Sequence, residues 1–253
     1  MNPPSIATVL LLAAHPDDEI AGAGGWAWRH PGPLAVAFLT DGVPRDPRYF
    51  APGFSNPERY RATRRREAEA VWRRHPQRPR LAFAPFADQE LAFALPAADA
   101  WLQQCIQRTS PHALLAPAFE GGHPDHDAAN LLAAIAAFRH GLAVYEYALY
   151  RASRGAVVWQ SFSAAPAKPL PPELARRKRR LLARYVSQAE VLRHVDPARE
   201  AIRALPAHNY AAPPAPTAYG LWGWPISPER VAAAMAHFAR SHLPLPASVP
   251  CAS

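Results

Sequence analysis

Two short clusters of histidine and carboxylate residues are the chemically most informative part of this sequence. The first is His15-Pro16-Asp17-Asp18-Glu19, and the second is His123-Pro124-Asp125-His126-Asp127. Each cluster follows an apolar run typical of a buried strand and precedes a segment with a helical pattern. Imidazole nitrogens and carboxylate oxygens are good ligands for zinc. Together the clusters supply the residue types of a zinc hydrolase with an open coordination position.

The spacing within the clusters suggests a set of three ligands and a base. His15 and Asp18 are three residues apart across a turn, so both side chains can face one ion. His126 could complete the set. Coordination lowers the pKa of water from about 15.7 to near 7. Asp17 is the adjacent carboxylate that could then accept the proton.

Two further residues of the second cluster are candidates for the chemistry. His123 could stabilise a developing oxyanion or protonate a leaving amine. Asp125 could orient one of the histidines. A single His-Pro-Asp sequence is more simply interpreted as the start of a helix, capped by the aspartate. Two such clusters with complementary ligands, each after an apolar run, favour the metal site.

Apolar runs and helical patterns alternate through the first 150 residues. The predicted strands cover residues 7–13, 34–40, 80–83, 113–118 and 143–149, and the predicted helices cover 19–30, 57–74, 96–108 and 127–138. This alternation predicts an α/β fold with a mostly parallel sheet and helices on both faces. Ligands bind beyond the carboxyl ends of such strands, where both clusters are expected.

The last third has a different character. It predicts a basic helix from 174 to about 194, a further helix starting near Pro197 and a final helix over 228–241. The basic run 176–180 could be a solvated face or a contact for an anionic carrier. The aromatic patch 219–224 could stack on a sugar or pack under the proline-rich loop. We expect one domain over 1–253, with a core over about 5–150 and a C-terminal helical extension, about 151–253, wrapping it.

Composition limits the remaining possibilities. The chain has 253 residues, of which 49% are hydrophobic, so it can form a sizeable core. Its formal charge of +8 is almost entirely arginine, and nothing resembles a nucleic-acid-binding module. Cys105 and Cys251 are the only cysteines, which excludes a cysteine-based zinc site.

The apolar run before His15 is too short to span a bilayer. No signal peptide is visible, so we expect a cytoplasmic protein without stable membrane insertion. The oligomeric state is not predicted.

The residues 14–19, taken together with 123–126, resemble the PIG-L/LmbE family of zinc-dependent N-acetylglucosaminyl deacetylases. The resemblance covers at least residues 7 to about 140. It implies a Rossmann-like (LmbE-like) sheet with the metal at the strand ends. By position, it implies His15, Asp18 and His126 as zinc ligands. It likewise implies Asp17 as general base and His123 as electrostatic catalyst or general acid.

Other segments extend the resemblance. Residues 63–68 are similar to a helix start of the family, which implies Arg64 as a substrate-contacting arginine. Asp88 matches a family aspartate near the sugar hydroxyls, and residues 185–188 resemble a segment late in these proteins. Two positions depart from the common pattern. Residues 120–122 mark a subset of the family, and Asp127 stands where many members carry arginine.

These features predict a metal-dependent hydrolase that removes the N-acetyl group from an N-acetylglucosamine-type sugar conjugate, small or carrier-linked. Zinc is the expected cofactor, although two histidines and one carboxylate also suit Fe²⁺. One alternative is an amidase that cleaves a different sugar-linked amide, such as a thiol-sugar conjugate. The other alternative is a sugar-binding protein without catalytic activity.

Overall fold

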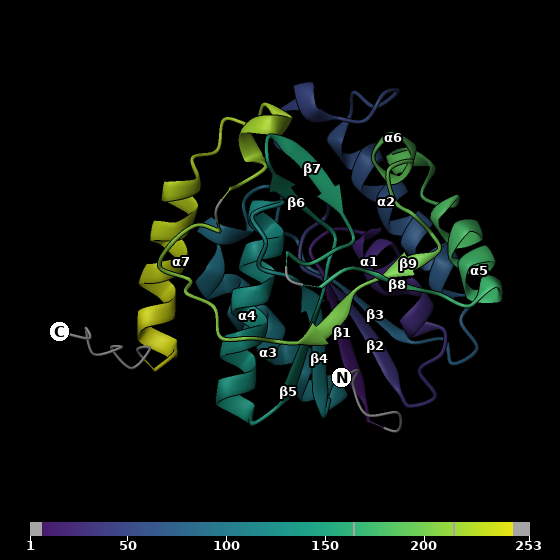
Figure 1. The fold of residues 1–253 in the computed structure, drawn as a ribbon, viewed down its shortest axis with the longest axis horizontal. Coiled ribbons are helices and arrows are strands. Elements are labelled where there is room, and N and C mark those ends of the chain that lie inside the picture. The colour runs from purple at the N-terminus through teal and green to yellow at the C-terminus, as the bar shows by residue number, and fades with distance from the viewer. Residues whose placement is uncertain (1–6, 164, 215, 245–253) are drawn as a thin grey trace.

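A six-stranded sheet forms the centre of the protein in a computed structural model that describes residues 7–163, 165–214 and 216–244 (Figure 1). The strand order is β10-β5-β4-β1-β2-β3. The strands are β1 (Val9–Ala13), β2 (Leu34–Phe38), β3 (Arg80–Phe83), β4 (Ala113–Pro117), β5 (Ala143–Tyr147) and β10 (Ile202–Ala204). The pairs among β1 to β5 are parallel, and β10 lies antiparallel to β5. The predicted α/β fold with a mostly parallel sheet is confirmed.

Helices cover both faces of the sheet, as predicted. One layer holds α1 (Asp18–Ala27), α2 (Pro57–Trp72) and α5 (Pro172–Leu182), and the other holds α3 (Leu95–Thr109), α4 (Pro124–His140) and α7 (Pro228–His242). Successive residues of a strand point to opposite faces. Leu11 of β1 therefore packs in the core under α1 and α2, while Leu10 packs in the core under α3 and α4. All five residues of β1 are buried, which explains its continuous apolar sequence.

The order of the strands determines where the two clusters meet. From β1 the chain continues to β2 and β3 on one side, and it then returns to β4 on the other side of β1. The carboxyl ends of β1 and β4 are therefore neighbours at a topological switch point. Open α/β sheets bind ligands at such a point. The segment 14–17 after β1 and the segment 118–123 after β4 start from this edge of the sheet.

The C-terminal third corrects two predictions. The basic helix is shorter than expected, because α5 ends at Leu182 and is followed by the 3₁₀ turn η3 (Val186–Gln188) and the short helix α6 (Ala189–Leu192). The helix predicted near Pro197 is wrong, since the chain forms β9 (Arg199–Glu200) and then β10. Pairing of β10 with the edge of β5 and hydrogen bonds from α1 to the Glu200 carboxylate override the local helical pattern.

Several short elements complete the fold without a clear signal in the sequence. They are the hairpin β6 (Tyr150–Ser153) and β7 (Ala156–Trp159), the strand β8 (Lys168–Pro169), and the 3₁₀ turns η1 (Pro47–Tyr49), η2 (Leu91–Phe93) and η4 (Tyr219–Trp222). The hairpin β6–β7 and the turn η4 lie at the same end of the molecule (Figure 1). Tyr150 of the hairpin packs against one of the histidines described below, and Trp222 of the turn packs against Tyr150.

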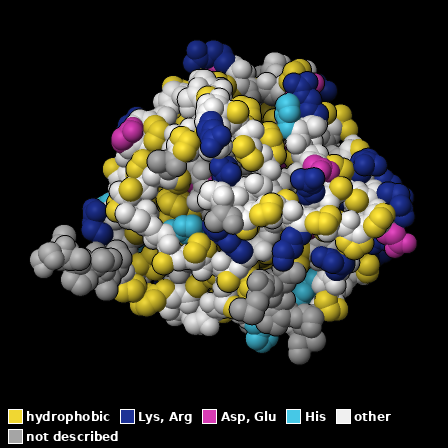
Figure 2. All heavy atoms as spheres, viewed as in Figure 1, with side chains coloured by type: hydrophobic (Ala, Val, Ile, Leu, Met, Phe, Trp, Pro, Cys, Tyr) yellow, Lys and Arg dark blue, Asp and Glu magenta, His cyan; other side chains and the backbone are white. Residues whose placement is uncertain are grey.

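The surface is basic, as the composition indicates. On the face shown in Figure 2, basic side chains are more frequent than acidic ones and gather at the right, in the region of α5. The arginines of α5 are exposed, which agrees with a solvated face, but Lys178 is buried and pairs with Glu200 at 3.0 Å. Among the described residues, no helix is both long and apolar enough to cross a membrane. Cys105 is buried with a free thiol, and Cys251 lies outside the described residues.

The close contact between α1 and β5 gives a test of the packing. A Cβ atom on Gly22 would lie 2.0 Å from Cδ2 of the fully buried Tyr147 ring. We expect Gly22→Ala to lower the free energy of unfolding by about 2 kcal/mol, because over-packing forces the ring and helix apart. The melting temperature should fall by about 4–8 °C.

Gly24→Ala is the matched control for this variant. A Cβ atom at Gly24 would first meet the flexible side chain of Ile20 in the same helix, at 3.1 Å. It should change the free energy of unfolding by less than about 1 kcal/mol. Equal melting temperatures for the two variants in a calorimetric scan would contradict the proposed packing.

Candidate metal centre

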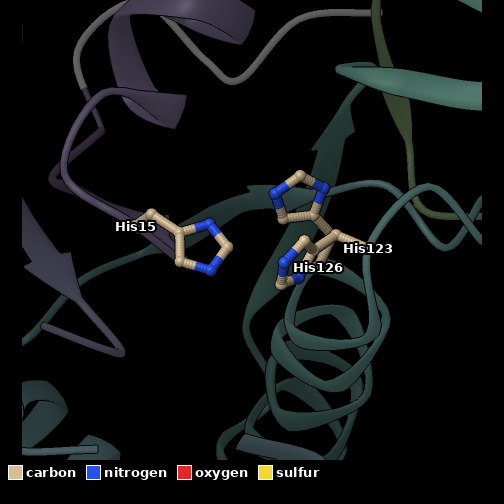
Figure 3. Close-up of side chains that lie close together, drawn as sticks. All are labelled: His15, His123 and His126. Atoms are coloured by element: carbon tan, nitrogen blue, oxygen red, sulfur yellow. The ribbon is translucent and has the colours of Figure 1, made fainter. Parts of the chain in front are cut away.

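Three histidines from the two predicted clusters meet at the switch point of the sheet. His15 lies in the segment between β1 and α1, His123 is the N-cap of α4, and His126 lies in its first turn. Their rings face one another from the two sides of the site (Figure 3). One nitrogen from each ring lies within 4.8 Å of the others. Residues more than a hundred positions apart thus form one buried cluster.

Asp18 joins the two sides of the cluster. Its Oδ2 atom lies 3.2 Å from Nδ1 of His15, and its Oδ1 atom lies 3.2 Å from Nε2 of His126. A tetrahedral ion about 2.0–2.2 Å from each ligand would separate the ligand atoms by about 3.3–3.6 Å. The observed spacings are close to that range. Burial raises the pKa of Asp18, but the imidazoles of His126 and His15 outweigh it and hold this pKa well below its usual range.

The geometry at His126 points to a third atom between the side chains. Its Nε2 atom is buried and has no hydrogen-bond partner, although Oδ1 of Asp18 is only 3.2 Å away. The two atoms are close but not aligned for a hydrogen bond. An unpartnered buried nitrogen is costly unless a ligand is bound. The donor set of two imidazoles and a carboxylate therefore fits a divalent metal ion.

Asp88 and Asp125 border the same cluster. Oδ2 of Asp125 lies 3.1 Å from Nε2 of His15 and accepts a hydrogen bond from the backbone N–H of Gln89, while its Oδ1 atom accepts one from the backbone N–H of Leu91. Oδ1 of Asp88 lies 3.2 Å from Nε2 of both His15 and His123, and it also lacks a hydrogen-bond partner. Asp125 can thus orient His15 from behind and leave Nδ1 free for a metal. The predicted contact of Asp88 with a substrate stays a prediction.

His123 has a defined tautomer in this arrangement. Its Nδ1 atom accepts a hydrogen bond from the backbone N–H of Asp125 at 3.1 Å. In a neutral ring the proton then resides on Nε2, which faces Asp88. Burial, followed by the charge of His15, lowers the pKa of His123 and favours this neutral form. The ring can therefore donate a hydrogen bond from Nε2.

His123 is as near to the centre as the predicted ligands, since it belongs with His15 and His126 to one group of possible ligands. A second such group joins His15 and His123 to Asp88 and Asp125. Distances alone therefore permit more than one ligand set. That Asp18 rather than His123 is the third ligand stays a prediction.

Asp17 has an unusual backbone conformation. As the N-cap of α1 it has φ 140° and ψ −30°, a region that favours glycine. Such a conformation costs about 1–3 kcal/mol and persists only when neighbouring groups hold it. Burial raises the pKa of Asp17 to about 7, although the nearby Arg64 opposes this shift. A buried carboxylate with such a pKa suits a general base.

Arg64 lies beside Asp17 and is buried with 4% of its surface exposed. Its Nη2 group donates to the carbonyl oxygen of Pro16 at 3.0 Å and to Oδ1 of Asp17 at 3.2 Å, and its Nη1 group donates to the carbonyl oxygen of Gly42. The guanidinium thus has three partners within the protein. The predicted contact of Arg64 with a substrate stays a prediction.

Two carboxylates of the clusters have functions that the sequence analysis did not assign. Glu19 is fully buried and accepts the backbone N–H of Asp17. Asp127 accepts the backbone N–H groups of Glu120 and Gly121 at 3.0 Å and the hydroxyl of Tyr219 at 2.6 Å. It therefore shapes the segment before His123. Their place inside the motifs was the only signal in the sequence.

Aromatic rings cover the histidines. The ring of Trp224 packs edge-on against His123 with 4.5 Å between centroids, and Tyr150 packs in the same manner against His126 at 5.2 Å. Trp222 contacts both aromatic residues, and its indole Nε1 atom is buried without a partner. The predicted aromatic patch thus packs directly over the cluster. His123 and His126 are each only 3% exposed.

Comparison with known sequences identifies a family that matches this chain. The sequence model of the PIG-L family, described as GlcNAc-PI de-N-acetylase, matches residues 10–137. This range contains both clusters, the strands β2, β3 and β4, and all of β1 except Val9. A search of curated proteins by sequence gives no match.

Solved structures share the fold. A deacetylase of teicoplanin biosynthesis, in complex with teicoplanin, aligns with a TM-score of 0.59 and 17% identity over 80% of this chain and 100% of its own. The zinc-inhibited form of teicoplanin deacetylase Orf2 aligns with a TM-score of 0.56 and 17% identity, over 79% and 100%. The N,N'-diacetylchitobiose deacetylase from Pyrococcus horikoshii, in complex with an inhibitor, aligns with a TM-score of 0.58 and 18% identity. The alignment covers 79% of this chain and 84% of the deacetylase.

The ligand assignment can be tested by metal analysis of purified variants. We expect His126→Ala and Asp18→Asn to lose bound metal, because each removes one of three ligands. His123→Ala should retain it. His140→Ala, exposed at the other end of α4, is the matched control. Loss of metal from the His123 variant that equals the loss from the His126 variant would overturn the assigned set.

Proposed function

Because this chain belongs to the PIG-L family of deacetylases, we propose that it is a metal-dependent hydrolase that removes the N-acetyl group from an N-acetylglucosamine-type sugar conjugate. The observation that carries this proposal is the buried cluster at the switch point. There the unpartnered Nε2 atom of His126 lies beside Asp18, and a second carboxylate, Asp17, is adjacent. One carboxylate faces the imidazoles, and the other is available as a base.

In this proposal His15, Asp18 and His126 hold the metal ion, zinc or Fe²⁺. When bound, the ion supplies Lewis-acid chemistry that polarises the amide carbonyl and acidifies a water molecule. The Asp125 carboxylate forms a hydrogen bond with Nε2 of His15. This contact fixes the orientation of the imidazole ring and leaves its Nδ1 atom for the ion. Backbone N–H groups of Gln89 and Leu91 keep this carboxylate in place.

Asp17 acts as the general base. Its carboxylate accepts a proton from the water that attacks the amide carbon, and it can return this proton to the departing amine. Burial raises the pKa of Asp17 to about 7, and a raised pKa suits a group that both accepts and returns a proton near neutral pH. One amide and one water give one amine and one acetic acid, which then ionises to acetate.

His123 acts on the carbonyl oxygen. As a neutral ring with its proton on Nε2, it donates a hydrogen bond to the charge that develops on that oxygen. It can instead pass this proton to the amine as the carbon–nitrogen bond breaks. The hydrogen bond from the Asp125 backbone N–H fixes the ring in the required orientation.

One cavity lies next to the segment that carries Asp88. It measures about 520 Å³ and is lined by residues that include Asp41, Arg61, Phe86 and Glu90. Its volume is in the range of small-molecule sites. Neither Asp88 nor the histidines of the cluster line this cavity, so the contact of Asp88 with sugar hydroxyls rests on the family resemblance alone.

The function is tested by a release assay with N-acetylglucosamine conjugates, using protein loaded with zinc or with iron. We expect a free amine and acetate in equal amounts. Release of an amino acid in place of acetate would favour an amidase for thiol-sugar conjugates. Tight binding of metal-loaded protein to a conjugate without amine release would favour a sugar-binding protein.

Removal of the base gives a second test. Asp17→Asn should lower kcat by about 10²–10⁴-fold, the usual contribution of a general base, while the metal content is unchanged. Asp46→Asn, at the half-buried N-cap of η1, is the control and should leave kcat unchanged. A kcat of the Asp17 variant within a factor of two or so of the wild type would remove the role assigned to this residue.

A further inference from the structure

We propose that Glu19 and Tyr185 are positioning residues that hold Asp17 in its strained conformation. The kinetic part of this proposal rests on the function proposed above, whereas the structural part does not. Tyr185 follows α5 and is far outside the residues matched by the family model. A C-terminal segment would then control the geometry of a base that lies near the N-terminus.

The strained backbone conformation of Asp17 persists only if neighbouring groups hold it. Six non-glycine residues among those described have a positive φ, and five of them have φ between 43° and 71°, in the ordinary left-handed region. Asp17, at 140°, lies well away from that region. Side chains with a Cβ rarely adopt this conformation. Without external bonds, the segment would relax and move the carboxylate.

Two buried side chains hold the peptide unit that joins Pro16 and Asp17. Glu19 Oε2 accepts the N–H of this unit at 2.9 Å, and Arg64 Nη2 donates to its carbonyl oxygen at 3.0 Å. Both polar groups of one peptide plane are therefore fixed from opposite sides. The same Arg64 nitrogen also contacts Oδ1 of Asp17. The backbone and the carboxylate are thus held together.

Glu19 is itself fixed by two donors. Its Oε1 atom accepts the hydroxyl of Tyr185 and the indole N–H of Trp72, the latter at 3.1 Å. All three side chains are at most 1% exposed. With three donors on its two oxygens and no exposed surface, Glu19 has no route to a substrate. Glu19 can therefore act only through Asp17, which makes it a positioning residue.

This arrangement explains why a carboxylate is needed at residue 19. The three groups that face Glu19 are all donors, so the site requires two acceptor oxygens. A glutamine would turn its NH₂ group towards at least one donor. That contact would leave a buried donor unsatisfied and would weaken the hold on Asp17. Tyr185→Phe is gentler, since it removes one donor and keeps the ring.

The kinetic test uses Tyr185→Phe and Glu19→Gln, with Tyr210→Phe as the matched control. Tyr210 is a buried tyrosine of the C-terminal segment whose hydroxyl donates to Asn130 instead. We expect kcat of the Tyr185 variant to fall about tenfold, with KM and metal content unchanged, because the base is displaced but present. The control should keep the wild-type kcat.

A positioning role is separated from a merely structural one in the Asp17→Asn background. If Tyr185 acts through Asp17, Tyr185→Phe should leave the residual rate of Asp17→Asn unchanged. A tenfold loss in both backgrounds would overturn the proposal. An unchanged kcat for both Tyr185→Phe and Glu19→Gln in the wild-type background would also overturn it.

Hydrogen exchange and melting temperatures test the structural part of the proposal without an activity assay. Hydrogen exchange of the Asp17 amide should be at least tenfold faster in Tyr185→Phe than in the wild type or Tyr210→Phe, because its acceptor is loosened. Asp17→Gly should melt several degrees above Asp17→Ala, since only glycine tolerates this φ. Unchanged exchange, or equal melting temperatures, would show that no strained conformation is held.

Discussion

The adjacency of β1 and β4 is the constraint on which the site depends. The parallel sheet places the carboxyl ends of these strands at one edge, and the reversal of strand order leaves that edge open to ligands. The motif after β1 supplies His15 and Asp18, and the motif after β4 supplies His123 and His126. A displaced register between the two strands would separate Asp18 from His126, since only 3.2 Å joins them.

Asp17 and Asp18 are neighbours in the sequence, but the backbone at the start of α1 gives their carboxylates different surroundings. Asp18 is the first residue of α1, and its carboxylate faces two imidazoles that stabilise the negative charge. Asp17 precedes the helix with a positive φ, so its carboxylate lies beside Arg64 instead. Burial dominates at Asp17 and raises its pKa to about 7. The difference between the proposed ligand and the proposed base therefore originates in the backbone, and then in the partners that each side chain meets.

Sequence patterns predicted the parts of the fold whose local and global preferences agree. The five strands β1 to β5 are short apolar runs in positions that are mostly buried, and the motif residues follow two of them. The predictions were wrong near Pro197, where pairing with β5 and bonds to Glu200 decide the structure. The roles of Glu19, Asp127 and Trp224 depend on contacts with Tyr185, Tyr219 and His123, which are distant in sequence, and no local pattern contains that information.

The C-terminal segment influences the chemistry although the family model does not match it. Trp224 packs against His123, and burial of that ring is the largest cause that lowers its pKa. A neutral His123 retains a proton on Nε2, because the Asp125 N–H occupies Nδ1. The aromatic cover thus favours the protonation state in which His123 can donate to an oxyanion. A change in this segment would therefore alter the acid–base behaviour of His123 and would leave the proposed ligands after β1 and β4 in place.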